Sequence, residues 1–129
     1  MPASWIPTLT QAIADACQVE AAGRGVELLG MMSEIQPKHA ASWRRLGLVQ
    51  PDIDYAEPVH GNHWREFGAL NFTPMVANIL QFPAGRAAGI GAVAEAGVLS
   101  FLVDYYEVPT TDPTLGAIVA RCRELTPAG

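Results

Sequence analysis

The chain has 129 residues, of which 50% are hydrophobic and 16% charged, and its formal net charge is −5. A chain of this length and apolar content can bury the core of one ordinary domain. Its eight basic residues are outnumbered by thirteen acidic ones, which leaves no cationic surface where a nucleic-acid backbone could release counterions, so we expect no nucleic-acid partner.

The sequence predicts a cytoplasmic protein without a membrane span. Its N-terminus lacks the basic segment and apolar run of a secretory signal. The longest weakly polar run, 87–103, carries Glu95 and falls short of the roughly 20 apolar residues that a bilayer requires. The two cysteines, Cys17 and Cys122, form no Cys-x-x-Cys pair. High apolar content with few charges predicts a homo-oligomer or a protein partner, because large exposed apolar patches are rare on monomers.

The first third of the chain has a helical pattern. Thr8 opens a capping box, and the apolar stripe that follows predicts a helix from about Leu9 to Ala22. Gly23 and Gly25 weaken this helix, but the apolar residues from Val26 to Ile35 continue the helical spacing. We therefore expect either one long helix with a soft joint or two helices.

The next segments combine a helix with a loop. Pro37 suits the first position of a helix, and Gly47 suits its end. The stretch from Val49 to Gly61 has two prolines, three acidic residues and no helical period, so it predicts a surface loop. Loops of this length often carry function.

Two short helices are predicted in the middle of the chain. Asn62 is a suitable cap for a helix from His63 to Leu70. Thr73 and Pro74 form a second cap and first turn, which predicts a helix from Met75 to Phe82.

The last third predicts two longer helices. Polar residues recur at helical spacing between Arg86 and Glu107, with apolar residues on the opposite face. The β-branched and aromatic content of Val98 to Val108 leaves a buried strand as the alternative there. Asp112 as cap, Pro113 in the first turn and an unbroken apolar stripe to Leu125 predict the final helix.

Together these elements predict an all-α fold, a compact single-domain bundle of about six helices that covers residues 1–129. The alternative fold class is α+β, with Val98 to Val108 as a buried strand.

Polar chemistry concentrates between Tyr55 and Phe67, which hold two of the three histidines, two glutamates and an arginine. A histidine beside a carboxylate can titrate near neutral pH, so His60, His63 and Glu66 are the candidate catalytic residues. With Glu57 they are also weak candidates for metal ligands. Residues three apart fan across half of a helix instead of converging, so we predict no metal site.

The leading functional hypothesis is a small helical binding or accessory module, dimeric, with a small-molecule pocket bordered by residues 55–67. The residues expected to contact the ligand are Tyr55, Trp64, Arg65 and Phe67. One alternative is a metal-assisted or general acid–base enzyme that uses His60, His63 and Glu66. Another is a structural subunit of a larger assembly. The sequence identifies no cofactor and no substrate.

Overall fold

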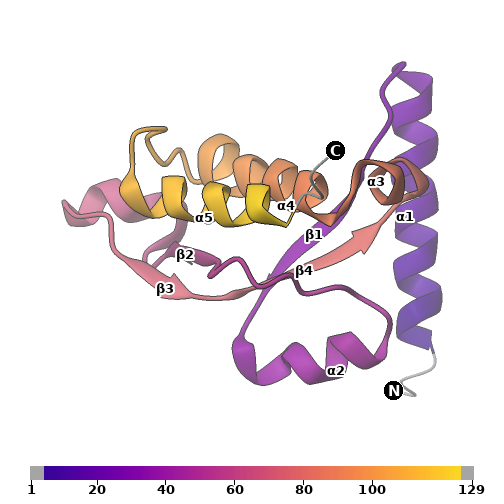
Figure 1. Ribbon diagram of the computed structural model, residues 1–129, viewed down its shortest axis with the longest axis horizontal. Coiled ribbons are helices and arrows are strands. Elements are labelled where there is room, and N and C mark those ends of the chain that lie inside the picture. The colour runs from indigo at the N-terminus through magenta and orange to yellow at the C-terminus, as the bar shows by residue number, and fades with distance from the viewer. Residues whose placement is uncertain (1–4, 126–129) are drawn as a thin grey trace.

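A computed structural model, which describes residues 5–125, has a mixed α+β architecture (Figure 1). The strands are β1 (Gly30–Ile35), β2 (Ala56–Pro58), β3 (Phe72–Pro74) and β4 (Val76–Gln81). The helices are α1 (Trp5–Gly23), the 3-10 helix η1 (Pro37–His39), α2 (Ala40–Arg45), the 3-10 helix η2 (Gly61–Phe67), α3 (Pro83–Ala88), α4 (Ile90–Val98), the π-helix η3 (Leu99–Tyr105) and α5 (Pro113–Glu124). The prediction of an all-α bundle is therefore wrong.

The strands form two antiparallel pairs. β1 pairs with β4, with Met31 opposite Leu80. β2 pairs with β3, with Glu57 opposite Thr73. An isolated bridge joins Val49 to Ile79 on β4, so β4 has backbone partners along both of its edges.

The helices predicted over Val26–Ile35 and Met75–Phe82 are wrong because β1 and β4 occupy those segments. Short apolar runs of this kind have the same composition in a buried strand and a buried helix, so periodicity cannot separate them. The pairing of two segments that lie far apart in the sequence decides the outcome. Gly30 permits the two strands to approach closely, because a Cβ at this position would lie 2.5 Å from the Leu80 carbonyl oxygen.

The alternative strand over Val98–Val108 is also wrong. Residues 98–105 complete α4 and form η3, so they are helical. The helical prediction for residues 86–107 holds over most of that range. It is interrupted at Gly89, whose φ of 96° ends α3 before α4 begins.

Local end signals located several helices correctly. α1 confirms the first predicted helix, although it begins at Trp5, before the proposed cap. η1 and α2 confirm the helix after Pro37, and Gly47 follows with a φ of 92°. In α5, Asp112 Oδ2 accepts hydrogen bonds from the Thr114 and Leu115 amides at 2.9 and 3.1 Å, as its capping position predicts.

The middle of the chain departs further from expectation. The predicted helix at 63–70 is the 3-10 helix η2, which follows His60 as its N-cap, so Asn62 does not cap it. The predicted loop at 49–61 is mostly irregular but contains β2.

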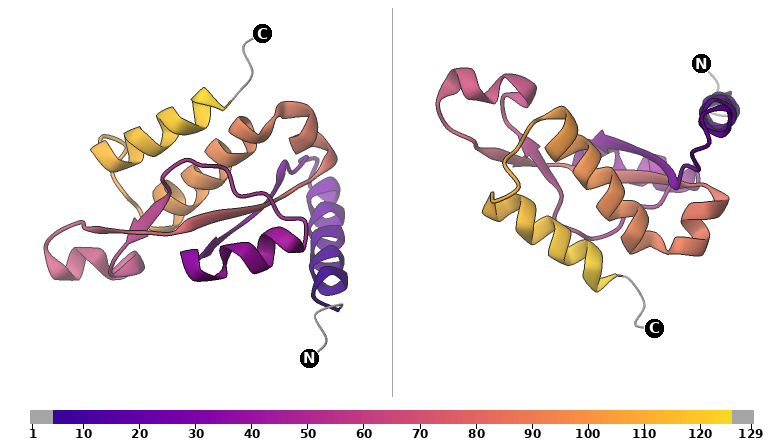
Figure 2. Two further views of the ribbon diagram at one scale, coloured as in Figure 1. Left: turned by 60° about the horizontal axis from the view of Figure 1, so that its bottom comes forward. Right: turned by 90° about the horizontal axis from the view of Figure 1, so that it is seen from above.

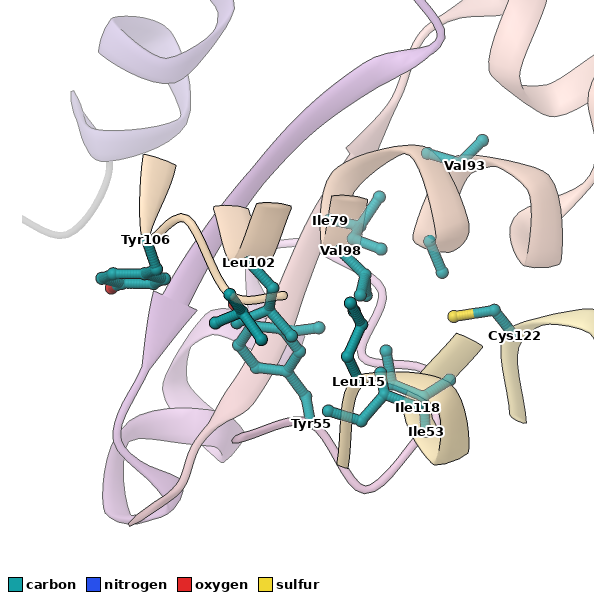
Figure 3. Close-up of a cluster of buried hydrophobic side chains, with 13 residues drawn as sticks. Ile53, Tyr55, Ile79, Val93, Val98, Leu102, Tyr106, Leu115, Ile118 and Cys122 are labelled. Atoms are coloured by element: carbon teal, nitrogen blue, oxygen red, sulfur yellow. The ribbon is translucent and has the colours of Figure 1, made fainter. Parts of the chain in front are cut away.

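The main core lies between the β1–β4 pair and two helices. α4 and α5 cover one face of this pair, and α2 lies on the opposite side (Figure 2). Ile79, Val98, Leu102, Ile118 and Cys122 are fully buried where these layers meet (Figure 3). α1 stands beside the strands at one end of the molecule (Figure 1).

The tightest backbone approach provides a test of this packing. A Cβ at Gly85 would lie 1.8 Å from the Leu29 carbonyl oxygen, whereas a Cβ at Gly116 in α5 meets nothing within 4 Å. We expect Gly85→Ala to lower the free energy of unfolding by about 2–3 kcal/mol, because backbone must move to admit the methyl group. The matched substitution Gly116→Ala should raise it by about 0.5–1 kcal/mol. Urea unfolding measures both; equal effects of the two substitutions would contradict this packing.

Candidate functional site

Four titratable side chains from separate segments meet at one end of the sheet. They are Glu34 on β1, Tyr55 just before β2, Glu57 on β2 and Tyr106 just after η3. The Tyr55 hydroxyl donates to Glu34 Oε2 at 2.7 Å. The Tyr106 hydroxyl lies 2.5 Å from Glu34 Oε1 and 3.1 Å from Glu57 Oε2. We call these four residues the Glu–Tyr cluster.

The π-helix η3 places Tyr106 in this cluster. The Tyr106 amide donates to the Phe101 carbonyl at 2.8 Å, a bond that spans five residues. The wider turn holds one more residue than an α-helical turn and so rotates the following side chains by about 100°. Short π-helical segments that interrupt or extend an α-helix are frequent at functional sites.

Backbone strain flanks both tyrosines of the cluster. Among residues 5–125, the only non-glycine residues with positive φ are Asp54, at 52°, and Glu107, at 57°. Asp54 directly precedes Tyr55, and Glu107 directly follows Tyr106. Such conformations cost about 1–3 kcal/mol each and persist where the surroundings impose them, often at functional sites.

The helix η2 holds one of these strained positions in place. Trp64 Nε1 donates to the Tyr106 carbonyl oxygen at 2.8 Å. Arg65 forms an ion pair with Glu107, with Nη1 and Oε2 2.6 Å apart, and its Nη2 donates to the Glu107 carbonyl at 3.3 Å. Two residues predicted to contact a ligand therefore support the backbone beside the Glu–Tyr cluster.

Burial and charge make Glu34 a carboxyl group that titrates near neutrality. Its pKa is raised to about 7, chiefly by burial and also by the nearby Glu57, against the opposing effect of the hydrogen bonds from Tyr106 and Tyr55. Burial and the adjacent carboxyls also raise the pKa of the Tyr55 and Tyr106 phenols, so both keep their protons.

The Tyr106 hydroxyl contacts two carboxyl groups but has one proton to donate. If it donates to Glu57, it must accept from Glu34, which then has to be protonated. A protonated Glu34 thus completes a chain from Glu34 through Tyr106 to the Glu57 carboxylate. Loss of that proton leaves two carboxylates around one donor.

The predicted catalytic residues His60, His63 and Glu66 lie at the surface, away from this cluster. The His60 ring stacks on Phe67, with centroids 3.7 Å apart. His63 Nδ1 lies 3.7 Å from Glu66 Oε1, and both side chains are about 70% exposed. Within residues 5–125, no group of three or more His, Cys, Asp or Glu side chains is placed to hold a metal ion. Of the weak metal candidates, Glu57 contacts Tyr106 instead of the histidines.

Two members of the Glu–Tyr cluster, Tyr55 and Glu57, lie in the segment 55–67, whereas Glu34 and Tyr106 were not among the predicted site residues. Glu34 lies 21 residues before Tyr55, and Tyr106 lies 42 residues after Trp64. The run 26–35 holds two glutamates, Glu27 and Glu34, and a carboxyl group within an apolar run is a signal for Glu34 because charged side chains are rarely buried.

A cavity of about 400 Å³ opens on the side of Tyr55, between α2, the segment 50–56 and the start of β4. We call it the Tyr55 cavity. Its size is within the range of small-molecule sites, about 300–1,000 Å³. Its apolar wall is formed by Pro51, Ile53, Tyr55, Ala56, Pro74, Met75, Val76 and Ala77.

The polar wall of the Tyr55 cavity is organised by a buried amide network. Gln50 Nε2 donates to the Ala40 carbonyl at 2.7 Å and to Asn78 Oδ1 at 3.2 Å. Asn78 is 1% exposed and donates in turn to Ser33 Oγ. Gln50 Oε1 accepts from Arg44 Nη2 at 2.9 Å, which fixes the guanidinium at the cavity wall.

The acidic and basic groups of the Tyr55 cavity are unequally paired. Arg121 approaches Asp52 and Asp54, with nitrogen–oxygen distances of 3.3 and 4.0 Å. Arg44, by contrast, forms no ion pair with any carboxylate in the part of the chain that the structure describes. The two aspartates therefore share one arginine, Arg121, whereas Arg44 lines the cavity without a carboxylate within 4.0 Å among residues 5–125.

Comparison with protein-family models, curated proteins and solved structures found no significant match. Among the described helices, none combines the length and apolar character needed to cross a bilayer. The geometry of the site therefore carries the functional argument.

The Glu–Tyr cluster predicts a specific dependence of stability on pH. The folded pKa of Glu34, about 7, is above its ordinary value of 4.5, so its contribution to folding is complete below pH 4.5 and is lost as pH rises through 7. Glu34→Gln keeps a neutral hydrogen-bonding side chain at every pH. We expect this variant to melt at a higher temperature than the wild type at pH 8, and this advantage to disappear at pH 5.

Thermal unfolding followed by circular dichroism at pH 5, 6, 7 and 8 measures this difference. Glu66→Gln removes an exposed carboxyl and serves as the control, whose melting curve should follow the wild type throughout. The groups facing Glu34 are Tyr55, Glu57 and Tyr106, and all are unchanged in both variants. A Glu34→Gln profile parallel to the wild type would show that Glu34 ionises normally.

Proposed function

We propose that the protein is a cytoplasmic binding module that takes a small molecule in the Tyr55 cavity, and that this molecule combines an apolar body with a carboxylate. The observation that carries the proposal is the position of Arg44: a guanidinium without a carboxylate partner among residues 5–125, held at the wall of a 400 Å³ cavity.

The chemistry of the walls supports this class of ligand. A guanidinium can bind a carboxylate through two parallel hydrogen bonds. Of the Arg44 nitrogens, one, Nη2, donates to Gln50. The apolar wall suits an aliphatic or aromatic body. Asp52 and Asp54 also line the cavity, but both lie near Arg121. The positive charge of Arg121 reduces the repulsion that these two carboxylates exert on an anionic ligand.

Two further observations bear on the proposal. Tyr55 and Ala56 line the cavity, so it borders the segment predicted to flank a pocket. Cys17 and Cys122 are both free thiols, which suits a reducing compartment. The alternative of an acid–base enzyme built on His60, His63 and Glu66 gains no support from the geometry, because all three side chains are exposed to solvent.

The neighbouring arginines of α2 provide a matched test. Arg44 lines the cavity and Arg45 does not. Binding of a panel of small aliphatic and aromatic carboxylates, each paired with its amide, is measured by ligand-observed NMR and calorimetry. We expect a carboxylate to bind and its amide to bind at least tenfold more weakly. Arg44→Gln should weaken carboxylate binding by about 10–100-fold, from the loss of a hydrogen-bonded charge.

Arg45→Gln removes the same charge from the adjacent position and should leave binding unchanged. Equal binding by both variants, or no preference for carboxylates over amides across the panel, would contradict the role given to Arg44.

A further inference from the structure

One edge of β1 carries no strand within residues 5–125. β4 covers the other edge, and Ile79 on β4 exchanges two hydrogen bonds with Val49, at 2.8 and 2.9 Å. The backbone polar groups of Ile79 therefore point away from β1. Because these groups alternate along a strand, those of Asn78 and Leu80 point toward β1.

The register then fixes which residues of β1 face its open edge. Asn78 and Leu80 lie opposite Ser33 and Met31, so these two residues pair inward with β4. The N–H and C=O groups of Gly30, Met32 and Glu34 point outward. No described side chain or loop donates to or accepts from the backbone of these three residues.

Two apolar grooves flank this open edge, one on each face of the strand. The groove on the α4 side measures about 370 Å³ and the groove on the other side about 170 Å³, and Met31 and Met32 line both. A strand added here would place alternate side chains in the two grooves. The first groove is also lined by Val93, Gly97 and Phe101, and the second by Ile13, Trp43 and Leu80.

We propose that β1 pairs in antiparallel register with β1 of a second copy of this chain, which joins the two molecules through a four-stranded sheet. This inference is independent of the ligand proposed above, because the Tyr55 cavity shares no lining residue with either groove.

A second copy of β1 can pair with every outward backbone group of this edge. Gly30, Met32 and Glu34 are symmetric about Met32, so a two-fold axis at Met32 pairs every outward backbone group. Met32 faces Met32 of the second copy, and Gly30 faces Glu34. Three such pairs exchange about six backbone hydrogen bonds.

The charges and side chains of β1 fit this register. Glu34 meets a glycine, and the two copies of Glu34 lie about 13 Å apart along the strands, which exceeds the Debye length of about 8 Å at physiological salt. Met31 and Met32 are adaptable side chains that suit an apolar seam. Ile13 of α1, which is 45% exposed, lines the groove beside Trp43 and is available to the second copy.

Light scattering and disulfide trapping test the pairing directly. In a Cys17→Ser background, Met32→Cys places two thiols opposite each other across the axis, with Cα atoms about 5.5 Å apart, which a disulfide can span. We expect rapid formation of a covalent dimer on mild oxidation. Ser42→Cys, at an exposed position of α2, is the control and should remain unlinked under the same conditions.

A charge substitution tests the same edge without cysteine. Ser33 is exposed in one molecule but would face Met31 of the second copy, so Ser33→Lys should raise the dimer dissociation constant at least about tenfold. Circular dichroism checks that the variant stays folded, because Ser33 Oγ also accepts from Asn78. Ser42→Lys should leave it unchanged. A wild-type monomer at about 100 μM, or a dimer in which residue 32 does not cross-link, would overturn the proposal. The second result would assign the dimer to another surface.

Discussion

The pairing of β1 with β4 is the constraint on which the other features depend. It places Ile79 beneath α4 and α5, where it is fully buried, and it directs Glu34 toward Tyr55 and Tyr106. On the opposite face, it brings Asn78 to Ser33, which anchors the amide network of the Tyr55 cavity. A two-stranded sheet is only marginally stable in water, so the helices that cover the β1–β4 pair supply much of its stability.

Tyr55 belongs to both parts of the candidate site. Its side chain lines the cavity, and its hydroxyl donates to Glu34 on the other side of the ring. A ligand that displaced this ring would disturb the hydrogen bond that opposes the raised pKa of Glu34. Because linkage is reciprocal, the protonation of Glu34 would then affect the ligand in turn.

The sequence predicted elements whose signals are local and missed those that depend on distant pairing. Asp112 and Pro113 define the start of α5 within a few residues, and α1 follows from its own apolar stripe. β1 and β4 carry no such signal, because each is six residues long and pairs with a segment more than forty positions away. The same distinction applies to the candidate site. Tyr55 belongs to the polar segment that the sequence singles out, whereas Glu34 and Tyr106 reach the Glu–Tyr cluster only through the sheet and the π-helix.

Part of the high apolar content of the chain lies on exposed surface of α1, close to β1. Ala14 and Ala21 of α1 are buried against the body of the molecule, whereas Leu9, Ile13 and Val19 remain exposed on other sides of the same helix. A helix with apolar residues on more than one face is suited to burial between two bodies. Ile13 lines the groove that also contains Met31 and Met32 at the open edge of β1. Exposed apolar surface at Ile13 and the unpaired backbone edge of β1 therefore meet at one place, and the proposed contact with a second copy would cover both.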